Sequence, residues 1–234
     1  MARNYYNLNK ANEKKIKLFL NTLIADNTTI VGYRNAFHSL GLCLGEILRE
    51  KYRINVKNTH LVCANEDADW LATGVMKGAG IEKTNISVFW TTRKILSTDP
   101  RIEITPIFKE YNSSLEPRDH LIVVKSVISS SCVVKTQITH IVNDVKPKFI
   151  HILSPVMLQS ADESLKKEFP PSIYNKFHFL AFAKDTESDE NGVVLPGVGG
   201  MVYHHLGIEI KENYMPALVK KRMWPSSYDD LLFG

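Results

Sequence analysis

The chain has 234 residues, of which 44% are hydrophobic, so it can bury one substantial core, and we expect one main domain. Its 29 basic and 25 acidic side chains leave a formal charge of +4, spread along the chain, which permits a phosphate ligand without demanding nucleic acid. The three cysteines, Cys43, Cys63 and Cys132, are widely separated, so neither a disulfide framework nor a cysteine zinc site is indicated. No apolar run approaches the about 20 residues that span a bilayer. We therefore expect a soluble cytoplasmic protein without membrane contact.

Two amphipathic helices are predicted near the start. Apolar residues recur at helical spacing from Lys14 to Ile24, and the polar run from Asp26 to Thr29 then supplies a helix stop and a new cap. A second apolar face runs from Ile30 to Glu50, which predicts a long helix there.

Short apolar runs then alternate with helix-length segments. The runs of strand length are Thr59 to Ala64, Ile86 to Trp90, His120 to Val124, Phe149 to Leu153 and Phe177 to Phe182. The helix-length segments between them are Asp67 to Gly78, Cys132 to Val145 and Ala161 to Phe169. This alternation predicts an α/β fold with a mainly parallel sheet flanked by helices. Because Leu121 to Val124 is apolar throughout and leads directly into a helix, we place that strand near the centre of the sheet.

One segment, Leu96 to Pro117, interrupts the alternation with apolar residues among polar ones, as in a protruding β-hairpin arm. Such an arm often serves a dimer, so we expect a homodimer. The polar stretch from Asp185 to Asn191 predicts a surface loop. We expect a domain over residues 1–210 that includes an arm at 96–117, followed by a C-terminal tail over 211–234 that is a candidate docking segment for a protein partner.

The first segment that carries chemistry joins the strand ending at Val124 to the helix beginning at Cys132. Small hydroxyl residues, Ser129 to Ser131, stand where the free backbone N–H groups and the positive dipole end of a helix suit a phosphate. Serines at a helix start also serve as simple caps, so both interpretations stay open. The candidate phosphate-binding residues are Lys125, Ser129, Ser130, Ser131 and Cys132.

The second such segment is the glycine-rich run from Asn191 to Gly200. Its glycines let the backbone pass close to a flat ligand or adopt positive φ, although an ordinary glycine turn has the same composition. A dinucleotide fingerprint is excluded, because no Gly-x-Gly-x-x-Gly is completed and the region about 20 residues on holds lysines, not an acid. The candidate base-binding residues are Val194, Leu195, Pro196, Gly197, Gly199 and Gly200.

Other polar clusters are less informative. His204 and His205 are adjacent, so their side chains point to different sides of the backbone, and packing is a better explanation than metal binding. Asn65 to Asp69 follows a strand, where acids fit a helix start better than a metal site. We therefore predict no protein metal site, and the three serines lack the Gly-x-Ser-x-Gly frame of a nucleophile.

In order and spacing across roughly Lys14 to Gly207, these segments resemble the uracil phosphoribosyltransferase family. That family opens with an apolar helix, an acid, a threonine, an aromatic-arginine pair and a long helix ending in glutamate, here Leu23, Asp26, Thr28, Tyr33-Arg34 and Glu46. The strand at Leu121 and the loop to Val133 lie where the family has its phosphoribosyl-diphosphate loop, usually Leu-Leu-Asp-Pro-Met-Leu-Ala-Thr-Gly-Gly-Ser.

The most specific match is Val194 to Gly207, which lies where the family has Val-Pro-Gly-Leu-Gly-Asp-Ala-Gly-Asp-Arg and a final Phe-Gly. The family reads uracil edges with the backbone of this loop, so the resemblance implies that Pro196, Gly197 and Gly199 preserve a base pocket. It also implies a type I phosphoribosyltransferase fold, a nucleotide or phosphorylated ribose as ligand, and Mg²⁺ bound with a phosphoribosyl ligand.

The departures from the family concern its charged groups. Lys125 matches the aspartate of the phosphate loop, and a cation cannot accept hydrogen bonds from ribose hydroxyls, although it can pair with phosphate. Asn65 to Asp67 matches the Arg-Ala-Gly of the diphosphate loop, and acids there oppose a polyanion unless a metal intervenes. Tyr203-His204 matches the late Asp-Arg pair, and Ser130 to Cys132 matches Thr-Gly-Gly. We therefore assign no catalytic residue.

Three hypotheses follow. The first is a uracil phosphoribosyltransferase-like protein that binds a nucleotide or a phosphorylated ribose and whose transferase activity is altered or lost. The second is a working phosphoribosyltransferase with another base substrate and rearranged ligands. The third is an interaction subunit without a ligand.

Overall fold

The computed structural model describes residues 3–8, 11–98 and 101–225, and its centre is one twisted sheet. The strands lie in the order β1 (Arg3–Tyr5), β10 (Phe177–Asp185), β9 (Phe149–Leu158), β7 (His120–Val124), β2 (Thr59–Ala64), β3 (Asn85–Thr91) and β6 (Ile107–Asn112), and β8 (Val127–Ile128) extends the pairing along β9. The five inner strands are parallel, and the two edge strands, β1 and β6, are antiparallel to their neighbours. The predicted α/β fold with a mainly parallel sheet is confirmed.

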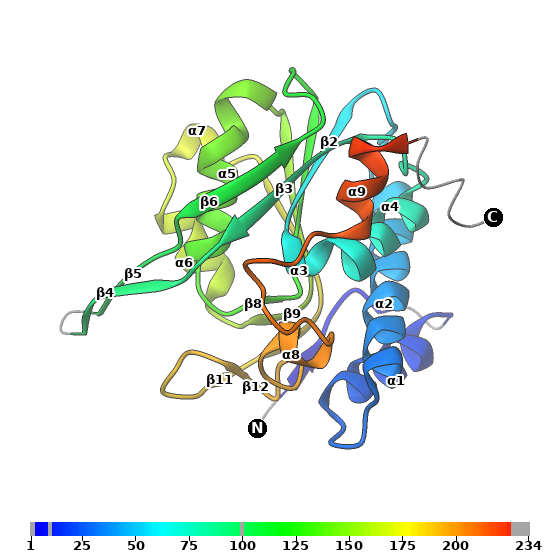
Figure 1. Cartoon of the computed structure of the whole chain (residues 1–234), viewed down its shortest axis with the longest axis vertical. Coiled ribbons are helices and arrows are strands. Elements are labelled where there is room, and N and C mark those ends of the chain that lie inside the picture. Colours follow the sequence, from blue (N-terminus) through cyan, green and yellow to red (C-terminus); the bar gives the residue numbers. More distant parts are fainter. Residues whose placement is uncertain (1–2, 9–10, 99–100, 226–234) are drawn as a thin grey trace.

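Helices cover both faces of the sheet (Figure 1). One face carries α1 (Glu13–Ile24), α2 (Ile30–Lys51), α3 (Asn65–Asp67), a π-helical turn η1 (Ala68–Ala72), α4 (Thr73–Ala79) and α9 (Ala217–Met223). The other face carries α5 (Cys132–Val145), α6 (Ala161–Lys167) and α7 (Pro171–Tyr174), and a short helix α8 (Val202–His205) lies near α1. No helix in the described part of the chain is long and apolar enough to cross a bilayer.

The central strand β7 is buried along its whole length between β2 and β9. Its alternate side chains enter two separate cores: Ile122 and Val124 pack toward α2, whereas Leu121 and Val123 pack toward α5. A strand covered on both faces needs apolar residues at every position, which explains its unbroken apolar sequence. The predicted central place of this strand is confirmed.

Helices α2 and α4 approach each other closely through glycines. A Cβ on Gly45 would lie 2.2 Å from the carbonyl oxygen of Val75, and one on Gly78 would lie 2.1 Å from that of Leu42. Such separations leave no room for any side chain. The close packing sets the position of α4 and of the helical segment that leads into it from Asn65, so it also sets the geometry at the end of β2.

The predicted arm is present but shorter than expected. Strands β4 (Lys94–Thr98) and β5 (Arg101–Ile104) form a two-stranded hairpin that protrudes from the domain (Figure 1). The rest of the segment, β6, joins the main sheet beside β3. Apolar-polar alternation is the same in a free hairpin and in a half-buried edge strand, so the pattern did not separate the two.

The C-terminal segment packs on the domain rather than extending from it. The carboxylate of Asp69 accepts hydrogen bonds from the backbone N–H groups of Ala217 and Leu218, both at 2.8 Å, and Val219 is fully buried in the core beside α2. Residues 226–234 lie outside the described part of the chain. Docking of a protein partner by the tail stays a prediction.

Candidate ligand-binding site

The topology of the sheet points to one place for a ligand. In chain order, the parallel strands begin with β2 and then β3, and the chain afterwards crosses to the opposite side of β2 to form β7, β9 and β10. The strand order therefore reverses between β2 and β7, and ligands of open α/β sheets bind outside the carboxyl ends of the strands at such a switch point.

A cavity of about 570 Å³ lies at this switch point. Its volume falls within the about 300–1,000 Å³ of small-molecule sites. The wall comes from strand ends, the start of α5, the glycine-rich segment and part of the C-terminal segment, and includes Glu66, Thr91, Arg93, Thr105, Lys125, Ser129, Ser130, Val194, Gly200, Tyr203, His204 and Lys211. The cavity thus brings together segments from six parts of the chain.

Opposite charges meet in the floor of the cavity. The Lys125 ammonium lies 2.7 Å from Oδ2 of Asp67 and 3.3 Å from Oε1 of Glu66, and it also donates to the Ser126 hydroxyl at 3.1 Å. Lys211 reaches the same Oε1 of Glu66 at 3.3 Å. The acids expected to oppose a polyanion are therefore paired with two lysines, and Lys125 is held by carboxylates rather than left free for a phosphate.

The pKa values follow from this pairing. Burial opposes ionisation of Glu66, but the ammonium groups of Lys125 and Lys211 outweigh it and lower the pKa of Glu66 to about 2. Burial also disfavours the charged form of Lys125, but Asp67 and Glu66 raise its pKa above the ordinary value. For Asp67, burial together with the neighbouring Glu66 charge outweighs the attraction of Lys125, and its pKa is raised. The pairing consequently favours the charged forms of Glu66 and Lys125.

A protein-bound Mg²⁺ does not fit this arrangement. Oε1 of Glu66 and Oδ2 of Asp67 already contact ammonium groups, and a divalent cation bound at this cluster would be repelled by both lysines. Within residues 3–8, 11–98 and 101–225, no group of three or more histidine, cysteine, aspartate or glutamate side chains is arranged to hold a metal.

At the start of α5, the predicted phosphate residues separate into two groups. Ser129 and Ser130 line the cavity, and the Ser130 hydroxyl accepts a 3.3 Å hydrogen bond from Arg93. Ser131 and Cys132 contribute no lining; their side chains point to Glu168 (3.4 Å) and to the carbonyl of Glu103 (3.6 Å). Ser131 makes no side-chain cap to the helix, so within the described residues the capping interpretation fails for it.

The glycine-rich segment is an ordered loop between a small hairpin and α8. The hairpin pairs β11 (Glu187–Ser188) with β12 (Val194–Leu195), and the loop then places Gly197, Gly199 and Gly200 at φ of 57°, 83° and 105°. Of the predicted base-binding residues, Val194 and Gly200 line the cavity, whereas Leu195, Pro196, Gly197 and Gly199 do not. Gly199 supports the fold, because a Cβ there would lie 2.3 Å from the carbonyl oxygen of Leu23.

An ion pair that no sequence pattern predicts fixes the position of this loop. Arg3 donates two 2.7 Å hydrogen bonds to the fully buried carboxylate of Asp185 and one of 2.6 Å to the carbonyl of Gly197, while the Gly197 N–H donates to Asp185 at 2.8 Å. The prediction that Asp185 begins a surface loop is therefore wrong at that residue, since it ends β10. The Tyr33 hydroxyl also donates to the carbonyl of Val198 at 2.7 Å.

Within the described part of the chain, neither histidine of the adjacent pair belongs to a group of three or more potential metal ligands. His204 lines the cavity, whereas the ring of His205 stacks on Tyr33 and its Nε2 donates to the carbonyl of Gly199 at 2.7 Å. The packing interpretation holds for His205.

The C-terminal segment closes one side of the cavity. The side-chain amide of Asn65 donates to the carbonyl of Lys211 at 2.8 Å, and the Trp90 indole donates to that of Tyr214 at 2.8 Å. These bonds join residues more than 100 positions apart, and the charged run at 209–212 gave no local signal of its place.

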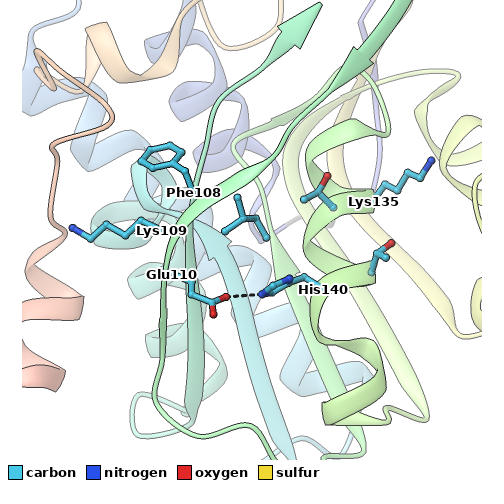
Figure 2. Close-up of a pocket in the computed structure, with 8 residues that line it drawn as sticks. Phe108, Lys109, Glu110, Lys135 and His140 are labelled. Carbon is cyan, nitrogen blue, oxygen red and sulfur yellow. Dashed lines mark hydrogen bonds and ion pairs between the residues drawn. The ribbon is translucent and has the colours of Figure 1, made fainter. Parts of the chain in front are cut away.

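A second hollow of about 550 Å³ lies between β6 and α5. Figure 2 shows Glu110 on the strand facing His140 on the helix, with an ion pair between them. Lys135, on the same helix, pairs with Glu168. This groove lies away from the switch point, so we place the candidate site at the first cavity.

No family model matches the chain, and no curated protein matches it. Among solved structures, the AQ2163 protein from Aquifex aeolicus superposes with a TM-score of 0.71 at 12% identity, over 87% of this chain and 98% of that one. A hypothetical protein from Neisseria gonorrhoeae with bound ppGpp gives 0.43 at 12% identity over 62% and 80%, and a hypoxanthine phosphoribosyltransferase from Staphylococcus aureus gives 0.38 at 14% over 53% and 65%. The first likeness shows that the overall fold is shared; the other two scores are too low to support an argument.

Proposed function

We propose that the chain is a uracil phosphoribosyltransferase-like protein that binds a nucleotide or a phosphorylated ribose in the switch-point cavity and no longer performs the transferase reaction. The observation that carries the proposal is the cavity itself, which lies at the carboxyl ends of β2 and β7 and has the start of α5 in its wall. Ser129 and Ser130 would hold a phosphate there, together with backbone N–H groups of the helix start.

The loss of transferase activity rests on the charged floor. The parent reaction develops positive charge on ribose while diphosphate leaves, so it depends on groups that stabilise both. In this chain, Lys125 stands where the resemblance places an aspartate, and it is paired with Asp67 and Glu66. Those carboxylates in turn occupy the place of a diphosphate loop. Each group has the opposite charge from the one that the reaction needs.

The test is isothermal titration with uridine monophosphate and phosphoribosyl diphosphate, combined with a turnover assay using uracil. We expect binding of uridine monophosphate without formation of that nucleotide from the two substrates. Steady-state turnover in the usual range of about 1 to 1,000 per second would show that the chain is an active transferase.

A charge variant tests the location of the phosphate. Ser130→Asp puts a carboxylate at the start of α5 and should abolish binding of uridine monophosphate, because like charges repel. Ser164→Asp, on the exposed surface of α6, adds the same charge elsewhere and serves as the matched control. Equal affinity in the two variants would place the ligand outside the cavity.

We also propose that the protein is a homodimer whose interface uses the arm. Ile95, Leu96 and Ile104 are 53%, 62% and 39% exposed, an apolar surface that a second copy of the arm would cover. Sedimentation should give a dimer at micromolar concentration and a monomer for Leu96→Glu. A monomeric wild-type protein would refute the proposal.

A further inference from the structure

Three buried oxygen atoms of residues that line the cavity have no partner among the described residues. In the part of the chain that the structure describes, no hydrogen-bond partner reaches Oε2 of Glu66, Oγ1 of Thr91 or Oγ1 of Thr105. All three residues are more than nine-tenths buried, and all three line the same cavity. Buried polar atoms are nearly always satisfied, so such a cluster indicates a place where another molecule supplies the hydrogen bonds.

The charges around Glu66 restrict what that molecule can present. A phosphate or diphosphate would face the carboxylate of Glu66, which repels it. A cationic group would face Lys125 and Lys211, both 3.3 Å from the other oxygen of the same carboxylate. A neutral hydrogen-bond donor avoids both repulsions, since a carboxylate accepts from it and a threonine hydroxyl can donate or accept.

The spacing of the strands sets how far apart the two ends of a bound ligand can lie. Thr91 ends β3, Glu66 follows β2, and Lys125 follows β7, next to the loop that leads to α5. Neighbouring strands lie about 4.8 Å apart, so β3 and β7 are about 10 Å apart along this edge. A ligand with a phosphate at Ser130 thus has room to extend its other end to the three oxygens.

We infer that Glu66, Thr91 and Thr105 form a subsite for the hydroxyl groups of a sugar whose phosphate binds at the start of α5. This inference rests on the proposed function and adds that the end of the cavity near β3 binds a neutral hydrogen-bond donor of the ligand. It also predicts that a diphosphate is rejected at that end, where the family resemblance would place it.

The test is titration with inorganic phosphate, ribose 5-phosphate and phosphoribosyl diphosphate. We expect ribose 5-phosphate to bind at least 10-fold more tightly than either of the other two. Thr91→Val keeps the shape of the side chain but removes its hydroxyl, so it should weaken ribose 5-phosphate 5- to 10-fold, leave phosphate unchanged, and leave the Tm of the free protein unchanged or higher.

Thr84→Val is the matched control. Its hydroxyl is equally buried but donates to the carbonyl of Thr59 at 2.6 Å, so its loss should lower the Tm and leave the affinity for ribose 5-phosphate unchanged. Glu66→Gln removes the negative charge and should narrow the preference for ribose 5-phosphate over phosphoribosyl diphosphate.

The outcomes separate the two proposals. Failure of ribose 5-phosphate, uridine monophosphate and phosphate to bind would refute the proposed function and this inference together. Equal affinity for ribose 5-phosphate and phosphoribosyl diphosphate, or no effect of Thr91→Val on the former, would overturn the inference alone. Weaker binding of ribose 5-phosphate than of its 2-deoxy form would assign the oxygens to another neutral donor, such as a base N–H, and would also overturn it.

Discussion

The buried polar side chains at the two ends of the parallel strands are stabilised in different ways. At the carboxyl ends, Lys125, Glu66 and Asp67 are buried as ions and pair with one another. At the amino ends, four strands each carry a histidine, namely His60, His120, His151 and His178. Here His120 Nδ1 lies 2.9 Å from His151 Nε2, and His60 Nε2 lies 2.8 Å from the Ser87 hydroxyl.

Burial favours the neutral form of the histidines, whereas the pairing favours the charged forms of Lys125 and Glu66. Burial lowers the pKa of His151 to about 3 and that of His60 to about 4, and burial lowers the pKa of His120 and His178 as well. No carboxylate pairs directly with His151 or His60 among the described residues. Buried charge is thus retained only at the end where opposite charges are present, which is also the end that has the cavity.

The largest effect should come from breaking the ion cluster. Lys125→Met leaves Glu66 and Asp67 buried without their main partner, so we expect a loss of about 3–5 kcal/mol in the free energy of unfolding. Urea denaturation at neutral pH measures it. Lys135→Met removes a surface ion pair with Glu168 and should change stability by less than about 1 kcal/mol. Similar losses of stability in the two variants would show that the buried cluster contributes no more to the free energy of unfolding than a surface ion pair does.

Lowering the pH should destabilise the protein mainly through the histidines at the amino ends of the strands. Because their folded pKa values lie below the ordinary 6.5, the unfolded chain takes up protons first, and stability falls as the pH drops from about 6.5 toward 4 and then 3. At pH 5, each of His60 and His151 should lower the free energy of unfolding by about 2 kcal/mol relative to pH 7. His151→Gln should flatten this slope in urea titrations, and an unchanged slope would contradict the assignment.

A smaller effect should follow from Lys211→Met. The Lys211 ammonium forms an ion pair with Glu66, and the Lys211 side chain is 21% exposed, so solvent screens part of the interaction. We expect a loss of about 1 kcal/mol in the free energy of unfolding, well below that of Lys125→Met. A loss as large as that of Lys125→Met would mean that the C-terminal segment, and not the strand end, dominates the cluster.

The elements of the fold were largely predictable, because the strands and helices carry strong local periodicity. The ends of β2, β7 and α5 match the predicted bounds, and β9 and β10 extend beyond them. The site was predictable only in part. Ser129, Ser130, Val194 and Gly200 line the cavity as expected, since each follows a recognisable strand-loop pattern.

The rest of the site could not be predicted, because its contacts join distant parts of the chain. Lys211 meets Glu66, and Arg3 meets Asp185, with no sequence pattern that pairs them. In the sequence, Thr91 and Thr105 have the character of ordinary strand and loop residues. In the folded chain, both line the same cavity. The position of Lys125 after β7 predicts a phosphate contact, but no sequence pattern pairs it with Glu66 and Asp67 on α3.

The role of Lys211 in the floor of the cavity has a consequence for synthesis on the ribosome. Glu66 and Asp67 emerge first, Lys125 follows, and Lys211 and the segment capped by Asp69 emerge much later. Domains generally fold as units, and this domain lacks buried Val219 and one wall of the cavity until its C-terminal segment has been made. A product that ends before Lys211 would lack one ionic partner of Glu66 and the segment whose backbone is bound by Asp69.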